Sequence, residues 1–400
     1  MSKTSVCYKI IMYIKSEMRK IMNEELNLDS IREEIDQIDS KIVALYEQRM
    51  DASKRVAKYK IENGKKVFDA NREIEKIRKV KSLTHNDFNS HGATELFEQI
   101  MSMSRKLQYQ LLAEKGALGK LAFIQVDALE KKDIRVVCPG TKGAYTQAAM
   151  ERFFGTDIHY FHVETFRDAM SAIDEGSADY AVLPIENSTA GMVSEMYDML
   201  VEFENYIVGE QILKIEHCLL GLEDVDLTKV STVYSHPQSF MQCAKYLREK
   251  GDWKKISMKN NAFAAEKVAL DQDPTALAIA GEFAGEVYGL KVIEKGIQDE
   301  KNNSTRFIVV TNQKIFCKDA KKISICFEIS HKSGSLYHML SHFIYNNLNL
   351  TKIESRPIED REWEYRFFID FEGNLADSSV KNALRGLRDE ARNMKILGNY

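Results

Sequence analysis

The chain has few of the features that mark proteins acting on nucleic acids, membranes or metal ions. Its formal net charge is -4 at pH 7, and it contains no basic block long enough to bind nucleic acid. The apolar stretch near the N-terminus is short, Lys9 interrupts it and no cleavage site follows, so we expect neither a signal peptide nor a membrane span. The six cysteines show no CxxC or histidine spacing, which predicts reduced thiols in a cytoplasmic protein and no metal site.

Length and composition predict a soluble protein of two or three domains. The chain has 400 residues, of which 44% are hydrophobic and 29% are charged, enough for several cores. Changes in texture predict an N-terminal extension in which Met22 offers a second translation start, a helical domain, a charged linker, an α/β domain and a small C-terminal domain. These segments span residues 1–23, 24–115, 116–132, 133–312 and 322–400.

Residues 28–59 predict one long helix with an apolar seam. The apolar residues recur at alternating spacings of three and four, which is typical of a helix that buries one stripe against other helices. They are Leu28, Ile31, Ile35, Ile38, Ile42 and Leu45. Asp29 and Ser30 offer an N-cap, and Asn63-Gly64 ends the helix.

The same register places Arg49 inside this seam. Burying its guanidinium is costly without an anion, so Arg49 pairs with a glutamate, reaches the edge of the seam or binds an anionic ligand. Lys60 shares its face roughly 16 Å further along the helix. Arg32 lies about 25 Å in the other direction and could reach the same ligand only from a second, antiparallel copy of the helix. The ligand hypothesis therefore predicts a dimer.

Two further helices, at residues 69–83 and 93–112, are predicted to complete a bundle with polar groups inside it, and residues 85–92 are predicted to form a loop. The polar groups are Asp69, Arg72 and Glu73 in the second helix and Ser104 and Gln108 in the third. A set rich in cations suits a small dicarboxylate. Because it has no nucleophile–base pair, catalysis there would use positioning and electrostatic stabilisation, without a cofactor.

The remaining chain predicts two further domains. Strands are expected at residues 135–138, 178–185, 231–234, 276–280 and 306–310, with helices such as 145–154 and 192–203 between them. This alternation predicts an α/β fold with ligands at strand-to-helix ends. No Gly-x-Gly-x-x-Gly turn follows the first strand, which argues against a dinucleotide site. Residues 322–400 show the βαββαβ order of a ferredoxin-like α+β domain.

The helical region, residues 26–112, resembles the all-helical chorismate mutase of the intertwined-dimer type, and all eight polar positions of that pattern are present. The resemblance implies that Arg49, together with Arg32 from a second copy, binds the carboxylates of chorismate. It implies that Lys60 and Gln108 bind the ether oxygen that gains negative charge, while Glu73 holds the substrate hydroxyl. The remaining members of the shell are Asp69, Arg72 and Ser104. The rearrangement to prephenate is pericyclic, which fits the missing acid–base pair.

Four motifs in the α/β region resemble prephenate dehydratase over about residues 133–312. They are GTKGAYT at 140–146, PIENS at 184–188, SHPQ at 235–238 and NSTRF at 303–307. The resemblance implies a two-lobed fold like that of periplasmic binding proteins, with a cleft in which prephenate loses carbon dioxide and water to give phenylpyruvate. It implies that Thr305 donates to the leaving hydroxyl and that Arg306 binds a carboxylate.

Further substrate-binding residues in the dehydratase region follow from the same resemblance. They are Tyr145, Glu186, Asn187, Ser188, Ser235 and His236. The chain departs from many relatives at Ala144, where a hydroxyl residue is expected, so Thr141 or Thr146 would have to replace that hydroxyl.

The C-terminal domain resembles an ACT domain, an amino-acid-sensing module. Two motifs carry the likeness, namely Gly334, Ser335 and Leu336, where Gly-Ala-Leu is usual, and Glu354, Ser355, Arg356 and Pro357. The implied effector is phenylalanine, bound between two ACT domains as a feedback inhibitor. The alternative is an ACT-shaped dimerisation domain without a ligand, which the Ser335 substitution favours.

Over its whole length the chain is similar to the bifunctional chorismate mutase/prephenate dehydratases, which implies a homodimer or homotetramer with both activities. Two alternatives remain. One activity could have been lost, although both polar sets are intact. The chain could instead be a solute-binding or sensor protein, but such a protein has no use for Arg49 in a helical seam.

Overall fold

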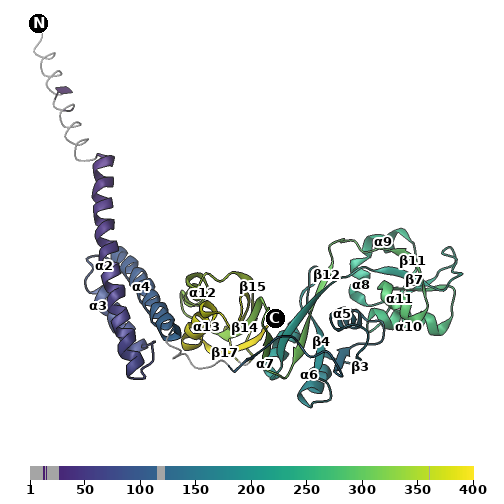
Figure 1. Cartoon of the computed structure of the whole chain (residues 1–400). Helices are drawn as coiled ribbons and strands as arrows, with labels where there is room; N and C mark the ends of the chain where they lie inside the picture. Colours follow the sequence, from purple (N-terminus) through teal and green to yellow (C-terminus); the bar gives the residue numbers. More distant parts are fainter. Residues whose placement is uncertain (1–11, 14, 16–26, 115–121, 360) are drawn as a thin grey trace, which may run out of the picture. The chain divides into compact units, whose positions relative to one another are not determined.

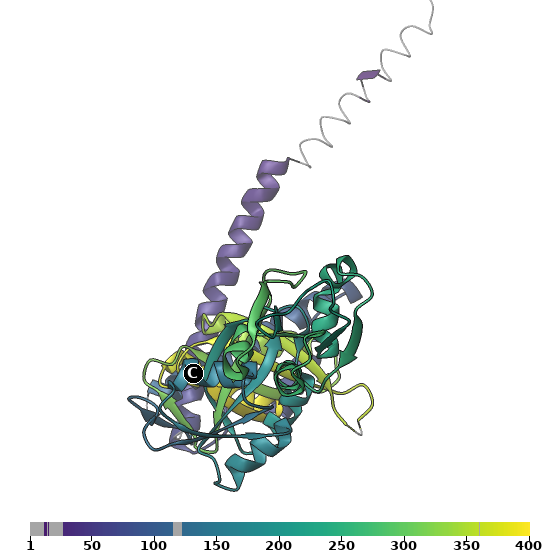
Figure 2. The same cartoon turned by 90° about the vertical axis from the view of Figure 1, so that its right-hand side faces the viewer.

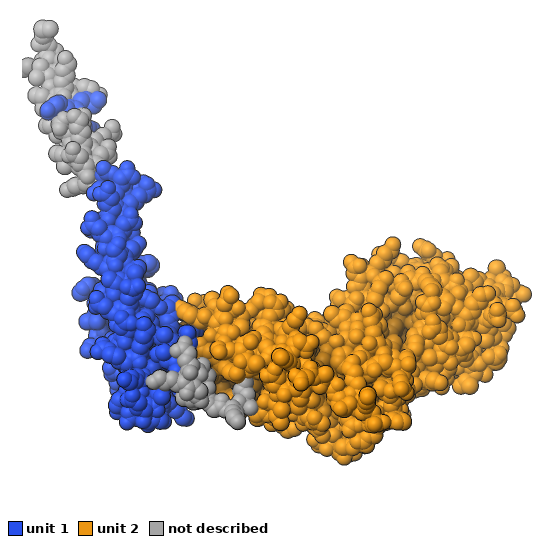
Figure 3. Space-filling view, in the orientation of Figure 1, with its two compact units in different colours: residues 1–118 blue, residues 119–400 orange. Residues whose placement is uncertain are grey.

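The structure, a computed structural model, forms two compact units (Figure 3). They are Met1–Leu118 and Gly119–Tyr400. Within them the structure describes residues 12–13, 15, 27–114, 122–359 and 361–400. The predicted N-terminal extension, with Met22, lies almost wholly outside the described residues, and so does the first part of the predicted linker.

The described part of the first unit is helical, as predicted. It contains α2 (Leu28–Glu62), α3 (Ala70–Lys81) and α4 (Asp87–Glu114). The N-cap of α2 is Asn27 rather than Asp29 or Ser30, because the Asn27 side chain accepts the backbone N–H of Asp29 at 3.0 Å. Asn63 ends α2 as expected.

The predicted loop at residues 85–92 is wrong, because α4 already begins at Asp87. The side chain of Asn86 accepts the backbone N–H of Asn89 at 2.8 Å and so starts the helix. Gly92 lies inside the helix, where a glycine costs about 1 kcal/mol relative to alanine. The added turn is therefore set by a cap that the hydrophobic pattern does not reveal.

The apolar seam of α2 is exposed within its own chain. The exposed fraction of its six residues runs from 37% at Ile31 to 63% at Leu45. Figure 1 shows the N-terminal half of α2 extending beyond α3 and α4, and Figure 2 shows the same half of α2 from the side. The buried cluster of this unit, formed by Val67, Tyr109 and Leu112, lies elsewhere. Burial of the seam therefore requires something other than the described residues of this unit.

The first lobe of the second unit is a sheet with helices on both faces (Figure 1). Its strands are β2 (Arg135–Pro139), β3 (His159–Val163), β4 (Tyr180–Asn187), β5 (Gly191–Met192), β6 (Tyr206–Lys214) and β12 (Ser304–Thr311). Because side chains alternate along a strand, Val136 and Cys138 pack in the core under α5 (Tyr145–Phe154), whereas Val137 packs with α6 (Phe166–Asp174) and α7 (Ser194–Glu202).

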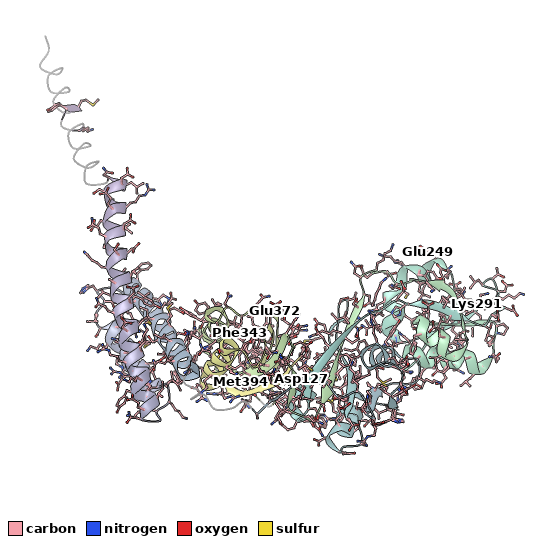
Figure 4. All side chains as sticks on the ribbon, viewed as in Figure 1. Asp127, Glu249, Lys291, Phe343, Glu372 and Met394 are labelled. Carbon is pink, nitrogen blue, oxygen red and sulfur yellow. The ribbon has the colours of Figure 1, made fainter. Side chains whose placement is uncertain are left out.

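The second lobe is a five-stranded sheet in the order β11-β7-β10-β8-β9. These strands are β7 (Cys218–Gly221), β8 (Thr232–Ser235), β9 (Lys254–Ser257), β10 (Ala276–Ala280) and β11 (Lys291–Lys295). One face carries α10 (Asn261–Asp271) and α11 (Glu282–Tyr288), and the other carries α8 (Pro237–Gln242) and α9 (Ala244–Glu249). Glu249 and Lys291 mark this lobe in Figure 4. The chain crosses between the lobes after β6 and again before β12.

The C-terminal domain has the predicted βαββαβ order. Its elements are β14 (Lys322–Glu328), α12 (Ser335–Tyr345), β15 (Leu350–Pro357), β16 (Tyr365–Glu372), α13 (Ser378–Glu390) and β17 (Arg392–Asn399). Both helices cover one face of the antiparallel sheet β15-β16-β14-β17, and Phe343 and Met394, labelled in Figure 4, belong to the core between them. No described helix of the chain is both long and apolar enough to cross a membrane.

The C-terminal domain and the first lobe share one sheet of ten strands. The junction is a single parallel pairing between Gly398 of β17 and Ile207 of β6. A Cβ on Gly398 would lie 2.0 Å from the Ile207 carbonyl oxygen, so this approach requires glycine. The predicted linker also contains structure, because β1 (Ile124–Val126) pairs with β13 (Ile315–Cys317).

Candidate active sites

The helical unit brings the predicted Arg49 and Ser104 together. Nη1 of Arg49 donates to the Ser104 hydroxyl and, at 3.3 Å, to the Ile100 carbonyl oxygen. Lys60, on the same face of α2, donates to the Val67 carbonyl oxygen. Burial lowers the pKa of Lys60, and nearby carboxylates oppose that shift. Two half-buried cations of α2 therefore point toward α3 and α4, as the register predicts.

A third cation of this cluster, Arg105, was missed by sequence reasoning. Its side chain forms an ion pair with Glu73, lies 5.4 Å from the Phe68 ring centroid and is 6% exposed. A lysine or arginine in a surface helix is usually solvated, and nothing in the spacing around Ser104 separates Arg105 from such a residue. Only the packing of α4 against α3 reveals it.

Of the other predicted residues of the helical site, Gln108 is buried, whereas Asp69, Arg72 and Arg32 lie at the surface or at a helix end. Gln108 is 6% exposed and its Oε1 has no hydrogen-bond partner among the described residues. Asp69 caps α3 by accepting the N–H of Arg72, and the Arg72 side chain is exposed beside Glu75. Arg32 is also exposed and lies 3.4 Å from Asp29. Within one chain Arg32 is therefore remote from the cluster, as its position on α2 requires.

The second candidate site is a cavity of about 670 Å³ between the two lobes. Of the predicted dehydratase residues, Tyr145, Asn187, His236 and Thr305 line it. Most of its lining is uncharged, and Lys259 is the only lysine or arginine among the described lining residues. No group of described side chains could hold a metal ion. The polar side chains of the described lining are therefore mostly neutral hydrogen-bonding groups.

Thr305 and Asn187 are hydrogen-bonded to each other across β12 and β4. Asn187 donates from Nδ2 to the Thr305 hydroxyl oxygen at 2.9 Å and to Asn303 Oδ1 at 2.7 Å. The Oδ1 atom of Asn187 accepts the backbone N–H groups of Thr189 at 3.0 Å and Ala190 at 2.9 Å, which establishes the orientation of the amide. Since Thr305 accepts from Asn187, its own hydroxyl hydrogen is left for a ligand.

Arg306 and Glu186 lie on the opposite face of the sheet, which differs from the expectation that both bind substrate. Alternation along β12 turns Thr305 and Phe307 toward the cavity and Arg306 away from it. Arg306 lies 3.2 Å from Glu186 and 3.0 Å from Asp370 of the C-terminal domain, and Lys352 of that domain lies 2.9 Å from Glu186. Burial alone would raise the pKa of Glu186, but Lys352 and Arg306 lower it.

Two predicted serines are also absent from the cavity lining. The Ser188 hydroxyl donates to the Asn302 carbonyl oxygen at 2.9 Å, and the fully buried Ser235 hydroxyl donates to the Ile279 carbonyl oxygen at 2.7 Å. Ser188 therefore joins two loops, and Ser235 joins the strands β8 and β10. Thr146, one of the two residues expected to replace the hydroxyl missing at Ala144, lines the cavity. Its hydroxyl donates to the Pro139 carbonyl oxygen.

Two lining residues, His217 and Gln242, were missed. His217 Nε2 lies 2.8 Å from Gln242 Oε1, and Tyr145 Oη lies 3.2 Å from His217 Nδ1. Gln242 stands one turn beyond the SHPQ motif in α8, so the helical period could have flagged it. His217 directly precedes the buried strand β7, and no local signal distinguishes it from a core histidine. Burial lowers the pKa of both His217 and His236.

The two predicted effector motifs lie in different places on the C-terminal domain. Gly334, with φ of 76°, Ser335 and Leu336 line a cavity of about 200 Å³. Residues 354–357 lie on β15, the edge strand of the sheet, and do not line that cavity. Arg356 instead pairs with Asp198 of α7, Nε to Oδ1 at 2.7 Å.

Comparison with known proteins matches both regions and the chain as a whole. Residues 31–109 match the chorismate mutase type II family, and residues 136–315 match the prephenate dehydratase family. The bifunctional chorismate mutase/prephenate dehydratase of Escherichia coli (strain K12) is 33% identical over 388 residues, which covers 95% of this chain and 97% of that protein. The bifunctional enzyme of Aquifex aeolicus (strain VF5) is 33% identical over 93% of this chain and 97% of its own length.

Among solved structures, prephenate dehydratase from Arthrobacter aurescens in complex with L-Phe is 28% identical with a TM-score of 0.62. It covers 67% of this chain and 89% of its own. The two family matches and the full-length relatives name the same two activities, and the chain has two separate candidate sites. The chain belongs to the bifunctional chorismate mutase/prephenate dehydratases and has both enzyme activities.

Proposed function

We propose that the chain converts chorismate to prephenate in the helical unit and prephenate to phenylpyruvate in the interlobe cavity, under feedback inhibition by phenylalanine. The observation that carries this assignment is the separation of the two polar sets into two compact units, a cationic cluster and a hydrogen-bonding cavity. We further propose that the enzyme acts in the cytoplasm as a homodimer or homotetramer.

In the mutase reaction Arg49 and, from a second copy, Arg32 bind the two carboxylates. Lys60 and Gln108 stabilise the negative charge on the ether oxygen as the C–O bond breaks, and Glu73 holds the hydroxyl. Two observations support a second copy, namely the exposed apolar seam of α2 and the distance of Arg32 from the cluster in its own chain. The remaining polar positions of the shell are Asp69, Arg72 and Ser104.

In the dehydratase reaction prephenate takes up one proton and gives phenylpyruvate, carbon dioxide and water. The bond to the ring carboxylate breaks, its electrons make the ring aromatic, and the hydroxyl leaves as water. Thr305 has a hydroxyl hydrogen that its neighbours do not use, so it donates to the leaving oxygen. Lys259 lies 2.9 Å from Glu164, which lines the same cavity, and takes the carboxylate role expected of Arg306 when the substrate carboxylate replaces Glu164 as its partner. Tyr145, Asn187 and His236 complete the contacts.

For regulation we propose that phenylalanine binds at the Gly334 cavity between two C-terminal domains of ACT type. The glycine backbone lets the charged groups of an amino acid approach closely. Residues 354–357 lie on an edge strand, which a second copy could cover so that both motifs meet. The solved relative from Arthrobacter aurescens is itself a complex with L-Phe.

The experiment supplies the purified full chain with chorismate and follows prephenate and phenylpyruvate, with and without phenylalanine, while light scattering gives the mass of the assembly. We expect phenylpyruvate to form, phenylalanine to suppress it, and the mass to be that of a dimer or tetramer. If phenylalanine does not change the rate of phenylpyruvate formation, the C-terminal domain is a dimerisation domain without a ligand. A monomeric, active mutase would contradict the role of Arg32.

A further inference from the structure

A chain of hydrogen bonds crosses the interlobe cavity from Tyr145 to Thr305. The first links join Tyr145 to His217 and His217 to Gln242. Gln242 Nε2 then donates to the Thr189 hydroxyl at 3.0 Å. The Thr189 hydroxyl lies 2.7 Å from Asn187 Oδ1, and Asn187 in turn donates to Thr305. Tyr145, Thr189 and Asn187 belong to the first lobe and Gln242 to the second, so the chain connects both walls of the cavity.

The positions of the hydrogens along this chain follow from one fixed point. Backbone N–H groups identify Oδ1 of Asn187, so the Thr189 hydroxyl must donate to that oxygen. Having used its hydrogen, Thr189 can only accept from Gln242, which turns the nitrogen of the Gln242 amide toward Thr189 and its oxygen toward His217. An amide oxygen needs a donor, so His217 carries its hydrogen on Nε2.

We propose that His217, as the Nε2–H tautomer, is a positioning residue of the dehydratase that holds the Gln242 amide with one N–H available to the substrate. One N–H of Gln242 is donated to Thr189, and the second, which has no acceptor among the described residues, is available to a molecule in the cavity that Gln242 lines. A dianionic substrate needs donors at this wall. If the Gln242 amide were reversed, its oxygen would face the substrate and would repel the substrate's negative charge.

The surroundings of His217 keep this arrangement rigid. The residue is 1% exposed, its backbone N–H donates to Gln298 Oε1 at 2.9 Å, and its ring meets Tyr145 edge-on with centroids 6.2 Å apart. Burial lowers the pKa of His217, so the ring is neutral. With its hydrogen on Nε2, the Nδ1 atom is an acceptor and shares the single Tyr145 hydroxyl hydrogen with the Glu216 carbonyl oxygen, which lies 3.0 Å from Tyr145 Oη. The inference rests on the cavity being the dehydratase site.

Two matched pairs of variants in the full-length enzyme test the proposal. His217→Gln places an amide N–H near the position of Nε2, whereas His217→Asn places one near Nδ1 and does not reach Gln242. We expect dehydratase kcat/KM to fall about tenfold or more in His217→Asn and to be largely restored in His217→Gln. Equal losses in the two variants would make His217 a packing residue and overturn the proposal.

The second pair avoids the core. Thr189 is exposed, so Thr189→Val removes the hydroxyl from the chain with little risk to folding, and Thr189→Ser keeps it. We expect Thr189→Val to lose several-fold more kcat/KM than Thr189→Ser. Thr228→Val, which removes an exposed hydroxyl on the surface of the second lobe, is the control and should match the wild type. Loss in the control equal to that in Thr189→Val would overturn the proposal.

The double variant His217→Asn/Thr189→Val shows whether the residues act as one unit. A single broken chain predicts a loss no greater than that of the worse single variant, and independent effects predict the product of both losses. The imidazole ¹⁵N shifts of His217 in the unliganded wild type give a reading without turnover. A protonated Nε2 is the expected result; a protonated Nδ1 contradicts the proposal even if the cavity is the dehydratase site.

Discussion

In the helical unit Arg49, Lys60 and Arg105 gather around Glu73, whereas the interlobe cavity has Lys259 as the single lysine or arginine among its described lining residues. The first site offers three cations and a carboxylate. The second offers few charges and a directed series of hydrogen bonds. The contrast follows the chemistry, since the pericyclic step only redistributes charge, while dehydration must bring a hydrogen to a leaving oxygen.

The largest effect that separates the two sites is expected from Arg49→Ala. Removing a half-buried guanidinium that faces the substrate should lower chorismate mutase activity by about a thousandfold. Dehydration of supplied prephenate by the same protein sample should be unchanged, which also controls for folding. Parallel loss of both activities would show that the sites are not independent.

Thr305→Val should produce the reverse pattern. The substitution keeps the shape of the side chain and removes the donor, so we expect dehydratase kcat to fall about a hundredfold while mutase activity persists. With chorismate as substrate, prephenate should accumulate and be visible by chromatography. Undiminished phenylpyruvate formation would remove Thr305 from the mechanism.

Arg105→Met tests whether the additional cation of the helical site matters. Losing the ion pair frees the Glu73 carboxylate in a partly buried place, and we expect mutase kcat/KM to fall about tenfold. Arg78→Met, on the exposed surface of α3, is the matched control and should behave as the wild type. If the two variants have equal activity, Glu73 is positioned without Arg105.

The smallest expected effect is a difference in acid stability between the units. Burial lowers the pKa of His162, His217 and His236, all in the second unit, whereas His85 and His91 of the helical unit are exposed. Because the unfolded chain then binds more protons, stability of the second unit should decrease as the pH falls below about 6.5.

Fluorescence can follow that unit alone, because both tryptophans, Trp253 and Trp363, belong to it. We expect its melting temperature to drop by about 3 °C between pH 7 and pH 5.5, with a smaller shift in the helical signal measured by circular dichroism. A larger shift in the helical unit would reverse the comparison.

Much of this arrangement was predictable from local patterns. The period of α2 set the face shared by Arg49 and Lys60, and the strand-and-helix texture located most elements of the second unit within a few residues. The start of α4 was missed because Asn86 caps it ahead of the periodic residues. Arg306 was expected to bind a substrate carboxylate, although alternation along β12 already places its side chain on the opposite face from Thr305.

Other features depend on contacts that no single segment encodes. Arg105 differs from a solvated surface arginine only because α3 brings Glu73 beside it. His217, just before β7, and Gln242, in α8, are 25 positions apart, and their pairing exists only once the second lobe has folded. Tertiary contacts therefore decide which polar residues of an ordinary helix or strand become part of a site.

The pairing of Gly398 with Ile207 also bears on how the molecule is made. These two residues lie far apart in the chain, so the β6 edge of the first lobe is synthesised long before β17 exists to cover it. During that interval the backbone of Ile207 lacks its Gly398 partner and is open to other nascent chains. The shared sheet is therefore completed only when the last strand of the chain has been made, and a side chain at position 398 would prevent that pairing because its Cβ would lie 2.0 Å from the Ile207 carbonyl oxygen.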